Sequence, residues 1–284
     1  MRKKALKNLF RKTLAAALVI TGVVSLTACS QKEASAGGEE KTNIVYVKGP
    51  GPYTELFEEA IIPILEKKGY TFKCVEMKLN EADVAINSGD ADLSVEQHTA
   101  YMDAFNKNSD GTLTALLKIP TVPAALFSKS HSSTDEISDG ATVAVPQDEG
   151  NQARALVMLQ DLGWITLKEG TDYATASPDD IETNKYNIKV HELDTNIIAT
   201  TLEDFDFGVV TGSIVYNAGL DLSTALFREN LTNNFWLQVV VKEADKNTQW
   251  AKDVVAAYQS EEFLTWLKEN NASKYNNLWS IPEY

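Results

Sequence analysis

The sequence predicts a mixed α/β protein with two lobes, and three observations support this fold class. Strand and helix patterns alternate along most of the chain, which is typical of parallel sheets covered by helices. The alternation occurs in two series, separated by an apolar segment with two prolines. About 240 residues follow the predicted leader and tether, enough for one large or two smaller α/β domains.

The N-terminus predicts secretion. Basic side chains lie at Arg2, Lys3, Lys4, Lys7, Arg11 and Lys12. The apolar run Leu14–Leu26 follows, and it is shorter than the roughly 20 residues that a membrane-spanning helix needs. We therefore assign residues 1–28 to a signal peptide. The stretch Leu26-Thr27-Ala28-Cys29 resembles a bacterial lipobox, which implies cleavage before Cys29 and a lipid on its sulfur. An ordinary secretory signal with an incidental cysteine is the alternative.

The mature chain is strongly acidic. The sequence has 26 Lys and Arg against 40 Asp and Glu, and removing the six basic residues of the signal leaves a net charge near −20. This charge disfavours nucleic acid as a partner. Residues 29–42 are small and charged without apolar periodicity, which predicts a flexible tether. Cys74 is the only cysteine besides Cys29, so we expect no internal disulfide and a buried apolar role for Cys74 in a strand.

The first series of elements begins at Asn43. We expect strands at Asn43–Lys48, Thr71–Met77 and Ala91–Val95, and helices at Tyr53–Lys68, Asn80–Ser88 and Thr99–Lys107. Pro63 lies inside the first helix and is expected either to kink it or to mark its true first turn. The run Ala115–Phe127 carries Pro120 and Pro123, which predicts an extended crossing segment rather than an interior strand.

The second series begins after this crossing. We expect strands at Thr142–Val145, Ile188–Leu193 and Phe207–Val210, and helices at Asn151–Gly163, Asn196–Leu202 and Ser213–Ala218. A further strand, Phe235–Val241, and a helix pair within Thr248–Asn271 are expected to return to the first lobe. The predicted division is therefore 43–122 with 235–284 for the first lobe, and 123–234 for the second.

Arg154 is the strongest candidate for a binding residue. The stretch Val143–Gly163 (VAVPQDEGNQARALVMLQDLG) predicts a strand, a loop and a helix that begins at Asn151, which places Arg154 in its first turn. A cation is unfavourable there unless an anion joins it, because the first turn exposes free N–H groups. Ligands also bind beyond the carboxyl ends of strands in such sheets. Two explanations stay open: Arg154 binds a carboxylate from outside, or it pairs with Asp148 or Glu149 in its own loop.

Catalytic motifs are missing from the sequence. It contains no GxSxG, HExxH, P-loop or CxxC pattern, so we expect a protein that is not an enzyme and needs no cofactor. A metal-binding lipoprotein that gathers the histidines with an acid such as Asp206 is an alternative. We expect His131 and His191 to lie on the solvated surface instead. His98 ends a strand, where a ligand would bind.

Several stretches of the chain match a known family. They are Gly49–Tyr53 (GPGPY), Asn80–Met102, Pro123 with Phe127–Lys129, and Ala144–Pro146 with Asn151 and Arg154. The combination of Q-H-x-x-Y after a strand with V-P-x-D-x-x-N-x-x-R is specific. On these residues the chain resembles the methionine-binding lipoprotein family (MetQ/NlpA), the substrate-binding component of ABC importers.

The resemblance implies a bilobed periplasmic-binding-protein-like fold (type II), with a ligand cleft and two crossing segments near Pro120–Ala124 and Asn233–Phe235. By position, the implied ligand-binding residues are Arg154 for the carboxylate with Asn151 beside it, Gln97, His98 and Tyr101 on the opposite wall, Tyr53 at the entrance, and Ser213 and Tyr216. Tyr53 or Tyr216 would offer a ring face to the ammonium group. The family usually has Ile-Asn-x-x-Tyr after the strand ending near Val210, and here Ser213 takes the place of the asparagine.

The implied function is an extracytoplasmic lipoprotein, anchored to the cell membrane through Cys29, that captures a free amino acid. L-Methionine is the leading ligand, and an ABC permease with its ATPase is the expected partner. A methionine-containing dipeptide or another small anion is the alternative within binding proteins, and a surface adhesin is the alternative from another class. Replacement of Arg154 is expected to abolish binding with little loss of stability if it serves an external carboxylate.

Overall fold

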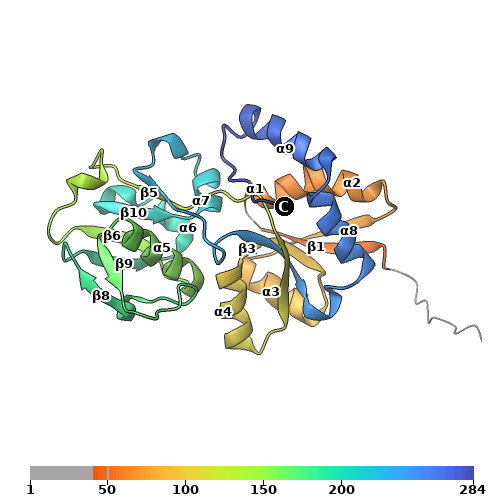
Figure 1. Cartoon of the computed structure of the whole chain (residues 1–284), viewed down its shortest axis with the longest axis horizontal. Helices are drawn as coiled ribbons and strands as arrows, with labels where there is room; N and C mark the ends of the chain where they lie inside the picture. Colours follow the sequence, from red (N-terminus) through yellow and green to blue (C-terminus); the bar gives the residue numbers. More distant parts are fainter. Residues whose placement is uncertain (1–40, 50) are drawn as a thin grey trace, which may run out of the picture. The chain divides into compact units, whose positions relative to one another are not determined.

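The computed structural model of the protein describes residues 41–49 and 51–284. The predicted signal peptide, the predicted lipid attachment at Cys29 and the predicted tether as far as residue 40 lie outside the described residues. None of the helices within the described ranges combines the length and apolar character needed to cross a membrane. The described part contains two five-stranded sheets, which define two lobes, and a separate two-stranded hairpin (Figure 1).

The first sheet is mixed rather than parallel. Its strands are β1 (Asn43–Lys48), β2 (Thr71–Glu76), β3 (Leu93–His98), β4 (Leu113–Lys118) and β12 (Leu237–Lys242), in the order β2-β1-β3-β12-β4. Strand β1 is parallel to β2 and β3, whereas β12 is antiparallel to both β3 and β4. The reversal follows from the path of the chain, because β12 enters the sheet from the side of the second lobe, towards which β3 and β4 run.

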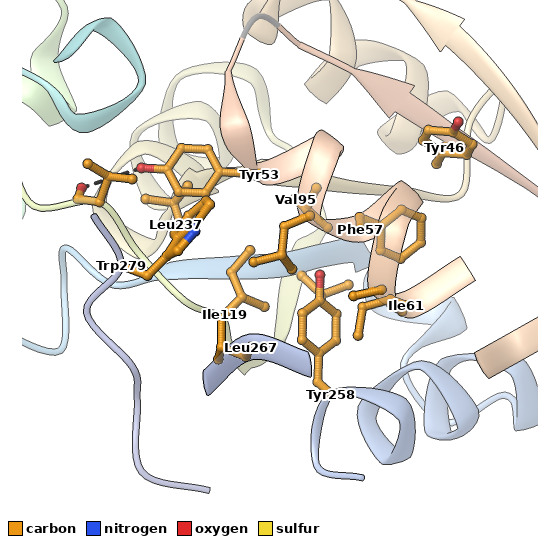
Figure 2. Packing of buried hydrophobic residues seen from close by; sticks show 14 of the residues in the cluster. Tyr46, Tyr53, Phe57, Ile61, Val95, Ile119, Leu237, Tyr258, Leu267 and Trp279 are labelled. Atoms are coloured by element: carbon orange, nitrogen blue, oxygen red, sulfur yellow. Dashed lines mark hydrogen bonds between the residues drawn. The ribbon is translucent and has the colours of Figure 1, made fainter. Parts of the chain in front are cut away.

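Helices cover both faces of this sheet. The helices are α1 (Pro52–Leu56), α2 (Ile62–Glu66), α3 (Leu79–Ser88), α4 (Thr99–Ser109), α8 (Gln249–Tyr258) and α9 (Glu261–Ser273). Neighbouring strand residues point to opposite faces, so Tyr46 packs against Phe57, whereas Val47 joins Ile86 and Met102 of α3 and α4. Figure 2 shows the first of these layers, where Phe57 and Ile61 lie near Tyr258 of α8.

Pro63 lies inside a continuous helical stretch. A π-helical segment, Phe57–Ile61, joins α1 to α2, and Pro63 sits at the start of α2. Proline has no N–H to donate to the preceding turn, and a widened turn accommodates that missing bond. The structure thus places a local change of helix type at Pro63.

The second sheet has the order β11-β5-β10-β6-β9. Its strands are β5 (Ala125–Phe127), β6 (Thr142–Pro146), β9 (Lys189–Leu193), β10 (Phe207–Val210) and β11 (Phe227–Arg228), and its helices are α5 (Glu149–Asp161), α6 (Thr195–Ile198) and α7 (Gly212–Asn217). Strand β6 is parallel to β9 and β10, whereas β5 is antiparallel to β10. The hairpin β7 (Ile165–Leu167) with β8 (Ile181–Asn184) was not predicted, because strands of three and four residues are too short to show a period.

The prediction for Ala115–Phe127 was wrong at both ends. Residues up to Lys118 belong to β4, and Ala125–Phe127 form β5, which lies between β11 and β10 in the interior of the second sheet. Both prolines fall between these strands, so neither removes a donor from a sheet. Only residues 119–124 form the crossing.

Three segments meet where the chain crosses between the lobes. The second crossing, residues 229–236, joins β11 to β12. The Thr121 hydroxyl accepts a hydrogen bond from the Leu237 N–H at 3.0 Å, which ties the first crossing to the start of β12, directly after the second crossing. Ser280, near the C-terminus, exchanges two backbone hydrogen bonds of 2.9 Å with Thr121. Tyr53 packs edge-on against Trp279, with ring centroids 5.4 Å apart, and both are visible in Figure 2.

Gly212 permits a close contact between the first crossing and α7. A Cβ atom on Gly212 would lie 2.1 Å from the Val122 carbonyl oxygen. Rotation of a side chain could not relieve this clash, because the carbonyl oxygen belongs to the backbone. We expect Gly212→Ala to lower the free energy of unfolding by about 1–3 kcal/mol, as overpacking does in other proteins. Urea denaturation tests this, with Gly219→Asn as a control at a glycine whose Cβ would meet no atom within 4 Å. Equal losses in the two variants would contradict the prediction.

Three smaller expectations concern Cys74 and two histidines. Cys74 is exposed rather than buried, because β2 is the edge strand of its sheet. His131 is only partly exposed, since its ring stacks on Phe207 with centroids 4.8 Å apart. Its ring nitrogens lie 3.5 Å from carboxylate oxygens of Glu136 and Asp206. His191 is exposed on β9.

Candidate ligand-binding site

A cavity of about 650 Å³ lies between the two lobes, next to the carboxyl ends of β3, β6 and β10. Its first-lobe wall comprises Gly49, Tyr53, Lys78, Leu79, Asn80, Glu96, Gln97, His98, Tyr101 and Leu237. Its second-lobe wall comprises Gln147, Asp148, Asn151, Arg154, Asp194, Thr195, Asn196, Thr211, Gly212, Ser213 and Ile214. Seven of the eight predicted ligand-binding residues therefore line one cavity, and the remaining one is Tyr216.

Helix α5 begins earlier than expected. Asp148 is its N-cap and accepts a hydrogen bond of 3.1 Å from the Asn151 N–H, so the helix starts at Glu149. Arg154 is consequently in the second turn, where backbone N–H groups already bond within the helix. The prediction that Arg154 lies in the first turn, beside free N–H groups, was therefore wrong. The helix boundary was misplaced because Asn151 and Asp148 are both good capping residues.

Arg154 forms a buried ion pair with Glu229. Its Nε donates to Glu229 Oε2 at 2.7 Å, its Nη2 donates to Oε1, and the two side chains are only 3% and 2% exposed. Glu229 also accepts from the Ala124 N–H, so one carboxylate ties α5 to both crossings. The partner is thus 75 residues away in sequence, and is neither Asp148 nor Glu149.

The pair leaves part of the guanidinium unused. Burial acts to lower the pKa of Arg154, but the Glu229 charge and hydrogen bonds raise it, so Arg154 stays cationic. A guanidinium has five N–H donors, and Glu229 takes two of them. The other three have no acceptor among the residues that the structure describes. Arg154 can therefore still donate to a group in the cavity, although its charge is already balanced.

His98 and Asn151 form a fixed polar link between β3 and α5. The His98 Nδ1 accepts from the Tyr101 N–H at 3.2 Å, so the proton is on Nε2, which lies 3.1 Å from Asn151 Oδ1. Burial lowers the pKa of His98 to about 3, and the Arg154 charge acts in the same direction, so the ring is neutral. The Asn151 Nδ2 donates to Asp148 at 2.8 Å and keeps a second N–H for a ligand.

Gln97 is buried and its side chain amide donates to Asp83 of α3. Asp83 is fully buried, and burial raises its pKa to about 7 despite that hydrogen bond. Asp83 Oδ2 and Gln97 Oε1 both lack a hydrogen-bond donor in the described part of the chain. The amide that was predicted to face a ligand is therefore partly committed to the interior of the first lobe.

The two tyrosines of the first-lobe wall, Tyr53 and Tyr101, differ in burial. Tyr53 is buried, and its hydroxyl donates to the Val122 carbonyl at 3.4 Å, so the ring is held by the first crossing (Figure 2). Tyr101 is partly exposed, next to the His98 ring. Both present aromatic surface to the cavity.

The second-lobe wall departs from expectation after β10. Ser213 lines the cavity, but Thr211 is the residue that directly follows the strand, and its buried hydroxyl has no partner within the described residues. Tyr216 does not line the cavity, because its hydroxyl donates to Glu55 at 2.7 Å on a different face of α7. Thr211 was detectable from sequence, since ligands bind directly beyond strand ends.

Glu96 and Glu229 were also missed. Glu96 stands next to the predicted Gln97 and His98 and could have been found by the same strand-end rule. Glu229 carries no local signal. The predicted alternative of a metal site is not assembled: no group of three His, Cys, Asp or Glu suited to a metal occurs within residues 41–49 and 51–284.

Comparison with known proteins agrees with this architecture. The family model for NlpA lipoproteins matches residues 48–279. The chain belongs to the NlpA lipoprotein family. Within this family, a relative named D-methionine-binding lipoprotein MetQ, from Salmonella typhi, is 31% identical over 258 residues, covering 88% of this chain and 92% of the relative.

Two solved structures resemble the chain closely. One is a nutrient binding protein from Burkholderia cenocepacia bound to methionine, with TM-score 0.75, 29% identity, and coverage of 86% of this chain and 100% of that one. The other is an ABC transporter periplasmic substrate-binding protein from Coxiella burnetii, with TM-score 0.75, 28% identity, and coverage of 84% and 100%. The bilobed fold of this chain is therefore that of substrate-binding lipoproteins.

Proposed function

We propose that this chain is the substrate-binding lipoprotein of an ABC importer and captures free methionine in the cavity between its lobes. The observation that carries the proposal is the Arg154 guanidinium, which lines the cavity with three unused N–H donors. The named relative and the methionine-bound neighbour supply the choice of amino acid. The function is one of binding, without a chemical step.

The cavity walls support an amino-acid ligand. The ligand carboxylate would accept hydrogen bonds from Arg154 and from the remaining N–H of Asn151. Tyr101, Leu79 and Leu237 offer aromatic and aliphatic surface to a thioether. Burial of that side chain would contribute about 1.5–3 kcal/mol.

Delivery would follow from motion of the lobes. Residues 119–124 and 229–236 are the segments that would absorb a hinge motion. Glu229 belongs to the second segment and holds Arg154, so a ligand at Arg154 would contact the hinge through one ion pair. The closed form would dock on a permease driven by its ATPase, and a lipid on Cys29 would hold the protein at the extracytoplasmic face of the cell membrane.

A thermal-shift panel of the amino acids, with both enantiomers of methionine, tests the proposal. A ligand at 100 times its dissociation constant adds about 2.7 kcal/mol to the free energy of unfolding, which is a clear rise in melting temperature. We expect methionine to produce the largest shift. A larger shift with a methionine-containing dipeptide would redefine the ligand, and the lack of any shift across amino acids and dipeptides would reject the importer function. Mass spectrometry of small molecules released from the purified protein provides an independent check.

A further inference from the structure

Glu96, on the first-lobe wall of the cavity, has one carboxylate oxygen with hydrogen-bond donors and one without. Glu96 Oε1 accepts from the Thr54 N–H at 3.0 Å and from the Thr54 hydroxyl. Oε2 has no hydrogen-bond or ion-pair partner within residues 41–49 and 51–284. Glu96 lines the same cavity as Arg154, on the opposite lobe.

Lys48 is the cation whose charge acts on Glu96, and Arg154 lines the opposite wall of the cavity; both pair with other carboxylates. Lys48 precedes the loop that contains Gly49 and Gly51, here called the glycine loop, and pairs with Glu58 at 2.8 Å. Arg154 pairs with Glu229. Burial raises the pKa of Glu96, although hydrogen bonds from Thr54 act to lower it. A cation brought by a ligand would therefore stabilise the charged carboxylate.

The glycine loop makes room for this carboxylate. A Cβ atom on Gly49 would lie 2.9 Å from Glu96 Cγ, and one on Gly51 would lie 3.4 Å from Oε2. Gly51 also has φ +150°, which other residues rarely adopt. A side chain at Gly49 would crowd Glu96, whereas a Cβ at Gly51 would make ordinary contact with Oε2. The absence of both side chains is compatible with a ligand group that approaches Oε2.

We propose that Glu96 binds the ligand's ammonium group, so that the site selects molecules with a protonated amine and holds an amino acid across the cleft. The inference rests on the proposed function in placing the ligand in this cavity. The ammonium would contact the first lobe at Glu96, and the carboxylate would contact the second lobe at Arg154. One zwitterion would thus link the two lobes through its two charges, which couples recognition to closure.

Calorimetric titration of three probes into wild-type protein and Glu96→Gln tests this assignment. The probes are methionine, its analogue without the amino group, and its analogue without the carboxyl group. The glutamine amide retains an oxygen for Thr54. Asp110→Asn is the matched control, since it removes one exposed charge at a left-handed residue that asparagine tolerates.

We expect wild type to bind methionine at least ten times more tightly than the analogue without the amino group. Glu96→Gln should weaken methionine binding about 10- to 100-fold, the range for a hydrogen bond to a charged group. It should leave the analogue without the amino group unaffected, and Asp110→Asn should bind like wild type. The comparison of methionine with the analogue without the amino group uses wild type alone. It therefore tests selection for the ammonium group even if Glu96→Gln fails to fold.

The outcomes separate this inference from the proposed function. The role of Glu96 would be overturned if wild type and Glu96→Gln bound methionine equally well. It would also be overturned if wild type bound methionine and the analogue without the amino group equally well. Either result would leave methionine capture intact. In a third outcome, wild type binds the analogue without the carboxyl group, Glu96→Gln does not, and no amino acid binds either protein. That result would support the role of Glu96 in binding an ammonium group and would reject methionine capture. Failure of every amine to bind wild type would reject both.

Discussion

Replacement of Arg154 by methionine should lower the free energy of unfolding by about 3–5 kcal/mol, because it leaves Glu229 buried without its cation. The same variant should lose amino-acid binding, since the unused guanidinium donors face the cavity. This differs from the expectation based on sequence, in which binding was lost with little change in stability. Urea denaturation and calorimetric titration measure the two effects separately.

A double variant separates the two roles of Arg154. In Arg154→Met/Glu229→Gln both charges are removed, while glutamine retains an oxygen for the Ala124 N–H. We expect most of the lost stability to return, because uncharged replacements of a buried ion pair are often neutral, whereas amino-acid binding should stay lost. Normal binding by the double variant would show that Arg154 serves only the ion pair with Glu229.

Asp83 should make stability fall as pH rises. Its pKa is raised from 3.8 in the unfolded chain to about 7 in the folded protein. Between these values the folded state binds the extra proton, so the contribution of Asp83 is fully present below pH 4 and is lost as pH rises through 7. The total change corresponds to about 4 kcal/mol.

Comparison with Asp83→Asn isolates this effect from the other titrating groups. Asparagine has the same shape and no charge, so the variant should match wild type near pH 4 and exceed it by several kcal/mol at pH 8. Asp90→Asn, at an exposed carboxylate just after the same helix, should show no such difference. A constant gap between Asp83→Asn and wild type across this pH range would contradict the buried, proton-binding state of Asp83.

Most elements of the fold were predictable because their signals are local. Periodic apolar residues predicted β1, β6 and β10 closely. The strand-end rule, applied to the sequence alone, singled out His98 and Arg154, and both line the cavity. The errors occurred where local signals compete. Two capping residues near the start of α5 left its first turn ambiguous, and two prolines obscured the strands on either side of them.

The direction of strands and the depth of burial depend on neighbours that the local pattern does not contain. Strand β12 is antiparallel because of where the chain returns from the second lobe. Cys74 has the neighbours of a core residue, yet it is exposed because nothing pairs with the outer edge of β2. Tyr216 matches the family pattern, but its hydroxyl turns to Glu55, away from the cavity.

The sequence alone determined the α/β alternation in two series, and it predicted an export signal and an arginine with a binding role. Each of these depends on residues close together in the chain. Only the tertiary structure decided what balances that arginine and which carboxylate lines the opposite wall of the cavity. Glu229 reaches Arg154 across 75 residues, and Glu96 meets the cavity from the other lobe. The Coulomb interaction and the loss of water act through space, so such partners are invisible until the chain has folded.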